Sequence, residues 1–132
     1  TTDYAVEMYF DAVAKGKYIC FVNKDTRLPM MFMDDAIRAT LELMDAPLES
    51  LNYHSNYNLS SMSFSAGELE KEISSHVDFE CIYKPDYRQD IADTWPISIN
   101  DDDARKDWGW EPKFDISKMT EEMITNLRRL NE

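Results

Sequence analysis

Residues 28–36 read Leu28-Pro29-Met30-Met31-Phe32-Met33-Asp34-Asp35-Ala36 and contain a step from an apolar segment into a helix. Pro29 has no amide proton to donate to a sheet, so we expect the apolar segment 28–33 to be an edge strand or a loop crossing an apolar surface. Asp34 and Asp35 are expected to cap a helix that runs to about Met44. This stretch therefore predicts an extended segment followed directly by a helix.

The helix expected after Asp35 is amphipathic and has a clear end. Ile37, Leu41 and Met44 fall on one of its faces, and Pro47 cannot continue it. Similar signals on either side predict further helices and strands. The expected elements are a helix over 5–13 capped by Thr2 or Asp3 and ended by Gly16, strands at 18–22, 57–59 and 79–83, a helix opened by the capping box Ser65–Glu68, a short helix at 104–106, and a last helix from about Ser117 with Met119, Met123, Leu127 and Leu130 on one face. The fold class is mixed α/β.

Composition limits the kinds of partner. The chain has 132 residues, with 26 acidic and 14 basic side chains and a net charge of −12, which is enough for one domain. This charge argues against nucleic acid and against an anionic membrane surface, because both require clustered Lys and Arg. No apolar stretch approaches the roughly 20 residues that span a bilayer.

The residues that catalyse reactions or bind nucleotides and metals are largely missing. Gly16, Gly67 and Gly109 are too far apart for a glycine-rich dinucleotide turn, and no tyrosine has a lysine four residues later. His54 and His76 match no zinc spacing, and Cys20 and Cys81 each lie alone in an apolar run, which favours buried, reduced thiols. We therefore expect no catalytic, cofactor-binding or metal-binding residue in this chain.

Two segments are candidates for binding a ligand. Arg88 and Trp95 lie in the irregular segment 87–96, where both could line the mouth of a pocket. The alternative is that Arg88 pairs with a neighbouring Asp and that Trp95 fills an apolar gap. The hydroxyls of Thr1 and Thr2 would cap the first helix or face a ligand. Because the chain opens at Thr1 without Met or a basic leader, we expect it to be a fragment without a signal peptide.

Several motifs resemble the C-terminal part of the extended short-chain dehydrogenase superfamily. They are Met31-Phe32-Met33-Asp34-Asp35-Ala36, Tyr57-Asn58-Leu59 with Ser63-Phe64-Ser65, Asp90-Ile91-Ala92-Asp93, and Trp108-Gly109-Trp110-Glu111-Pro112. Other stretches are more similar to one family within it, the NAD-dependent L-threonine 3-dehydrogenases. These are Thr1-Thr2-Asp3-Tyr4-Ala5-Val6-Glu7, Thr26-Arg27-Leu28-Pro29-Met30-Met31, Tyr87-Arg88-Gln89, Ile91-Ala92-Asp93-Thr94-Trp95-Pro96 and Ala104-Arg105-Lys106-Asp107-Trp108-Gly109-Trp110.

The resemblance implies a parent enzyme that oxidises L-threonine to 2-amino-3-ketobutyrate with NAD. Family members carry their glycine-rich nucleotide site and their Ser/Thr–Tyr–Lys catalytic group upstream of the matching region. Residues 1–132 would then be the C-terminal substrate-binding lobe with the last elements of a Rossmann-type fold, inactive alone. NAD would be bound mainly by an N-terminal half, the parent would form a homodimer, and it would work in the cytoplasm or mitochondrial matrix.

The resemblance also implies roles for four residues. Thr1 and Thr2 would line the amino-acid pocket, Trp95 would cover the substrate, and Arg88 would lie nearby. Two other interpretations stay open: the equivalent lobe of a nucleotide-sugar epimerase or dehydratase, and a non-enzymatic acidic interaction module. The strands at 18–22 and 57–59 are expected to pair with strands of the missing half, so the isolated chain would be marginally stable or would self-associate.

Overall fold

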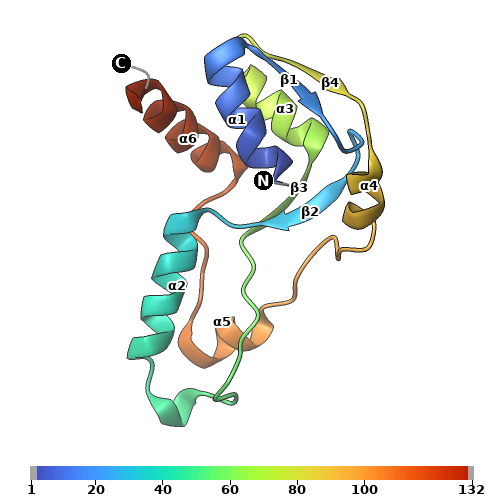
Figure 1. The fold of residues 1–132 in the computed structure, drawn as a ribbon. Coiled ribbons are helices and arrows are strands. Elements are labelled where there is room, and N and C mark those ends of the chain that lie inside the picture. Colours follow the sequence, from blue (N-terminus) through green and yellow to red (C-terminus); the bar gives the residue numbers. More distant parts are fainter. Residues whose placement is uncertain (1–2, 131–132) are drawn as a thin grey trace.

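The computed structural model describes residues 3–130 and shows a mixed α/β fold, as predicted. Helices α1, α3 and α6 lie together beside two short sheets, while α2 and α5 extend away from them (Figure 1). The elements are α1 (Tyr4–Lys15), β1 (Lys17–Cys20), β2 (Arg27–Met30), α2 (Met33–Asp45), a 3₁₀ turn (Leu48–Ser50), β3 (Met62–Ser65), α3 (Ala66–Ser74), β4 (Glu80–Tyr83), α4 (Tyr87–Ala92), α5 (Asp102–Trp108) and α6 (Ile116–Leu130).

Each sheet has two strands. β1 pairs with β4 in parallel, with Tyr18 opposite Cys81. β2 pairs with β3 in the antiparallel sense, with Leu28 opposite Phe64. Pro29 lies within β2, so the expected edge strand is confirmed.

Local sequence signals set several helix ends. The Asp3 side chain caps α1 by accepting hydrogen bonds from the amides of Ala5 and Val6. Gly16 ends α1 with a φ of 66°, and a Cβ there would lie 3.2 Å from the Asp78 carbonyl oxygen. Ser65 and Glu68 form the expected capping box of α3.

The main core lies among α1, α3, α6 and the sheets. Its largest fully buried side chains include Tyr4, Met8, Tyr9, Leu69 and Ile73. Tyr9 donates or accepts a hydrogen bond of 2.6 Å with the hydroxyl of Thr120, which joins α1 to α6 inside this core. No helix in the described range 3–130 is long and apolar enough to cross a membrane.

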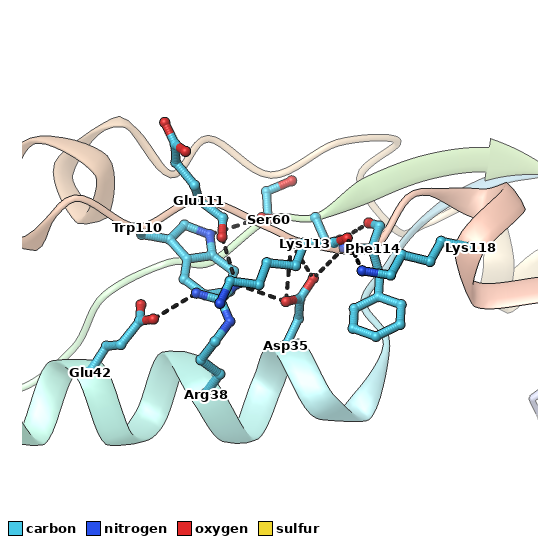
Figure 2. Close-up of polar contacts among 10 residues, drawn as sticks. Asp35, Arg38, Glu42, Ser60, Trp110, Glu111, Lys113, Phe114 and Lys118 are labelled. Atoms are coloured by element: carbon cyan, nitrogen blue, oxygen red, sulfur yellow. Dashed lines mark hydrogen bonds and ion pairs between the residues drawn. The ribbon is translucent and has the colours of Figure 1, made fainter. Parts of the chain in front are cut away.

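Asp35 does not cap α2, and this corrects the sequence-based prediction. The residue before the helix is Phe32, and no side chain there makes a capping hydrogen bond. Asp35 is instead fully buried in the first turn, where its carboxylate accepts hydrogen bonds from the amides of Lys113 and Phe114 (Figure 2). The Asp-Asp-Ala step therefore fastens α2 to the segment that leads into α6.

Arg38 extends this attachment by one helical turn. Its guanidinium donates to Asp35 at 2.8 Å and to Glu42 at 2.7 Å, and lies 4.6 Å from the centre of the Trp110 ring (Figure 2). The Trp110 indole donates to the Ser60 carbonyl oxygen at 3.0 Å. Trp110, Ala39 and Ala104 form a second, smaller core between α2 and α5.

One further prediction was wrong. Residues 57–59 form no strand; Tyr57 instead donates a hydrogen bond of 2.6 Å to Asp107. The strand expected at 18–22 forms as β1 and pairs with β4 within this chain; its pairing with strands of a missing half stays a prediction. The apolar face of α2 is exposed, as is Leu130 at the end of α6; the α2 residues concerned are Ile37, Leu41 and Met44.

Candidate functional site

Two small hollows meet at Trp95. The first has a volume of about 170 Å³ and lies between the start of α1, the end of β1 and α4; its lining residues are Tyr4, Phe21, Val22, Leu28, Arg88, Ile91, Ala92 and Trp95. The second has about 150 Å³ and is lined by Asp3, Tyr4, Leu28, Pro29, Met30 and Trp95. Hollows of this size suit a small ligand or part of one, because pockets for drug-sized ligands are larger.

Trp95 is placed by the end of α4. Its amide donates to the Ala92 carbonyl oxygen at 3.1 Å, which closes a turn directly after the helix. The side chain is 57% exposed, so it borders both hollows and does not fill an apolar gap. An indole in this position can cover the apolar part of a ligand that enters either hollow.

Arg88 borders the first hollow and also pairs with a neighbouring acid. Both roles considered for it from the sequence, lining a pocket and pairing with an Asp, therefore occur together. Its Nη2 lies 2.6 Å from Oδ2 of Asp86, and its Cζ lies 3.4 Å from the centre of the Phe21 ring. The hydrogen bonds from Arg88 hold the pKa of Asp86 below its usual value. The charge of Arg88 is therefore balanced locally.

The sequence analysis missed Gln89, which holds α4 in place. Gln89 is 9% exposed, and its Oε1 accepts hydrogen bonds from the Asn23 amide at 2.6 Å and the Thr26 hydroxyl at 3.1 Å. Its Nε2 donates to Asp93 at 2.6 Å. Asn23 and Thr26 lie in a turn more than 60 residues away, so no local pattern could have indicated these two partners.

The sequence analysis also missed Tyr4, which borders both hollows. Its side chain is 2% exposed, and its hydroxyl has no hydrogen-bond partner within residues 3–130. Burial raises the pKa of Tyr4, so the hydroxyl is protonated at neutral pH. In the sequence Tyr4 lies directly before the helix predicted over 5–13, and no signal marks its hydroxyl.

Among the described residues, the remaining candidates give no second site. Thr1 and Thr2 lie outside the described residues. Cys20 and Cys81 are buried and free, as predicted. Within the described part of the chain, no group of three or more His, Cys, Asp or Glu side chains could hold a metal ion.

Comparison with known proteins finds relatives that match most of this chain. No protein-family model matches the chain. The mitochondrial L-threonine 3-dehydrogenase of cattle is 48% identical over 126 residues, and the match covers 94% of this chain and 34% of that protein. A solved structure of a monomeric L-threonine 3-dehydrogenase from a metagenome is 92% identical, with a TM-score of 0.94, over 98% of this chain and 42% of that one.

The holo form of a GalE-like L-threonine dehydrogenase from Cupriavidus necator is 46% identical, with a TM-score of 0.91, over 94% of this chain and 41% of that structure. The chain is homologous to part of the GalE-like L-threonine dehydrogenases. This confirms the resemblance found in the sequence and places the α/β fold as a portion of an extended short-chain dehydrogenase fold.

Other relatives carry different names. A protein of Staphylococcus haemolyticus named as an epimerase/dehydratase is 48% identical over 94% of this chain and 40% of its own length. A heptose epimerase of Helicobacter pylori is 17% identical with a TM-score of 0.76, which shows the shared fold alone. The chain spans about a third to two fifths of the length of the curated relatives it matches.

The three glycines within residues 3–130 do not form a dinucleotide-binding turn. Gly16 and Gly109 each end a helix with a positive φ, so neither opens a helix toward a pyrophosphate. Gly67 lies in the first turn of α3, but its amide already donates to the Lys24 carbonyl oxygen at 2.8 Å. No step that uses NAD is therefore assigned to these residues.

Proposed function

We propose that this chain is the C-terminal substrate-binding portion of an NAD-dependent L-threonine 3-dehydrogenase. The two hollows that meet at Trp95 carry the proposal, because they join small volume, apolar walls and a few polar groups. The threonine dehydrogenase relatives support it. The site would close over L-threonine and exclude water, while an N-terminal nucleotide-binding half holds NAD and the groups that transfer the hydride.

The rest of the proposal follows from the same relatives. Residues 1–132 are one lobe, inactive alone, and Thr1, Thr2, Arg88 and Trp95 contact or surround the substrate. The parent is proposed to be a homodimer that works in the cytoplasm or in the mitochondrial matrix. The cattle relative is named as mitochondrial.

A nucleotide-sugar epimerase or dehydratase is the second candidate, because relatives at 44–48% identity are named epimerase/dehydratase. Such a substrate contains a diphosphate, which calls for several basic groups. Arg88 is the only basic residue among those lining the two hollows, and Asp86 already neutralises it. The lining therefore favours an amino acid.

Substitution of Trp95 tests the site. In the full-length dehydrogenase that carries these residues, Trp95→Ala is expected to lower kcat/KM for L-threonine roughly tenfold or more, because the apolar cover of the substrate is lost. NAD affinity should stay within about twofold of the wild-type value, since the nucleotide site lies elsewhere. Steady-state kinetics and a separate NAD titration measure the two effects.

Ile97→Ala is the matched control, because Ile97 is 64% exposed in the same segment and lines neither hollow. It should change neither value. A collapse of NAD affinity in Trp95→Ala would show that the placement of Trp95 is wrong.

The isolated chain provides a second test. Pure 132-residue protein should produce no NADH from L-threonine and NAD, because the proposal places the hydride-transfer groups elsewhere. The full-length protein, assayed in parallel, should produce it. If the full-length protein also fails with threonine, the non-enzymatic interpretation or the epimerase interpretation gains instead.

A further inference from the structure

Tyr4 is an exception among the buried polar groups of α1. Its side chain is 2% exposed, yet its hydroxyl has no hydrogen-bond partner in the described range. Folded proteins pair nearly all buried polar atoms, so an unpaired one calls for a partner that arrives later. That partner can be a ligand.

Tyr9 gives the internal comparison. It lies on the same helix and is also 2% exposed, but its hydroxyl pairs with Thr120 at 2.6 Å. Burial of tyrosine on α1 therefore does not itself leave a hydroxyl unpaired. What separates the two residues is their surroundings, because Tyr4 borders both hollows at Trp95 and Tyr9 borders neither.

The charges around the first hollow limit the class of ligand that can bind there. Arg88 and Asp86 form a balanced pair, and the chain as a whole carries a net charge of −12. A free anion would be repelled by this field, whereas a zwitterion has no net charge to repel. Tyr4 lines both hollows, and a neutral hydroxyl is a good donor to a carboxylate, since hydrogen bonds to ionised acceptors are the stronger ones.

We infer that the Tyr4 hydroxyl donates a hydrogen bond to the carboxylate of a small amino acid bound beneath Trp95. This inference rests on the proposed function and adds to it a residue that binds the substrate. The unpaired hydroxyl costs the unliganded protein stability, and binding of the amino acid removes that cost.

The same substitution at the two tyrosines tests this in the full-length dehydrogenase. Tyr4→Phe should weaken L-threonine binding roughly tenfold, while the melting temperature without threonine stays the same or rises. Tyr9→Phe should lower the melting temperature and leave threonine binding unchanged, because it breaks a satisfied hydrogen bond. Calorimetric titration with L-threonine, in the presence of NADH to prevent turnover, measures affinity.

L-threonine amide identifies the contacted group, because it lacks the carboxylate charge. Tyr4→Phe should cost much less affinity for the amide than for threonine, as a double-mutant cycle requires of a direct contact. Equal losses for both ligands would overturn the assignment to the carboxylate.

Two other results would overturn the inference entirely. One is that Tyr4→Phe binds threonine as tightly as the wild type. If the melting temperature of this variant is also lowered, the Tyr4 hydroxyl is paired within the protein. The other is a wild-type enzyme that neither binds nor oxidises threonine, which would remove the proposed function as well. The wild-type measurement therefore separates failure of this inference from failure of the function.

Discussion

Asp35 shows how one buried carboxylate can join distant parts of this chain. It accepts hydrogen bonds from the amides of Lys113 and Phe114, at 2.9 and 3.0 Å, and pairs with Arg38 at 2.8 Å. Each donor satisfies part of a charge that would be very costly to bury alone. Removal of the carboxylate leaves two backbone amides without their acceptor, and the Arg38 guanidinium loses one of its partners but keeps Glu42.

Asp35→Ala is therefore expected to lower the free energy of unfolding by about 3–5 kcal/mol, the range for breaking a buried ion pair. Urea denaturation followed by tryptophan fluorescence measures it. Asp34→Ala is the control, since Asp34 is exposed one residue earlier in the same turn, and it should cost well under about 1 kcal/mol. Equal losses in the two variants would refute the role given to Asp35.

Residues whose function depends on distant partners could not be predicted from the sequence. Asp35 was predicted to be a helix cap because it stands at the start of a helix. Its carboxylate instead accepts a hydrogen bond from Lys113, 78 residues away, which no local pattern indicates. Tyr4 was not singled out, because a missing hydrogen-bond partner leaves no trace in a sequence. Arg88 and Trp95 were found because charged and aromatic side chains in an irregular segment are typical of pocket walls.

At the scale of elements, helices with local end signals were predicted best. Each of these end signals contacts backbone only a few residues away, so the sequence alone shows where the helix begins or ends. The signals are Asp3, Gly16 and the Ser65–Glu68 pair. The strand predicted at 57–59 does not form, because a strand needs a neighbouring strand to pair with. The Tyr57 hydroxyl donates a hydrogen bond to Asp107 instead. Helix α4, with 6 residues, was too short for a periodic pattern.

The capping box gives a prediction at this scale. Ser65→Ala should lower the free energy of unfolding by about 1 kcal/mol, because the Glu68 amide loses its acceptor at the start of α3. Thermal or chemical denaturation followed by circular dichroism measures it. Ser55→Ala, in an exposed loop, is the control and should have little effect. A Ser65→Ala protein as stable as the control would contradict the assigned cap.

At the scale of the whole molecule, the described residues leave apolar surface and sheet edges uncovered. Both sheets have only two strands, and isolated two-stranded sheets are marginal. Ile19 on β1 is 55% exposed, and the apolar face of α2 is open as well. Parallel strands are normally covered on both faces and flanked by further strands, so this chain lacks the cover that such a sheet requires.

The isolated chain should therefore self-associate or melt with low cooperativity, as expected from the sequence. Analytical ultracentrifugation at several protein concentrations, with a thermal melt, measures this. Ile19→Lys should reduce association, because a lysine on an edge strand opposes pairing with another chain. A compact monomer with a sharp, cooperative melt would be the opposite result.

The attachment of α2 has one more consequence. The amide protons of Lys113 and Phe114 are held by a side chain on α2 and not by their own backbone neighbours (Figure 2). They can exchange with deuterium only when Asp35 withdraws, so their exchange rates record how often that helix detaches from the rest of the chain. The exchange rates of these two backbone amides therefore report how often the smaller core opens.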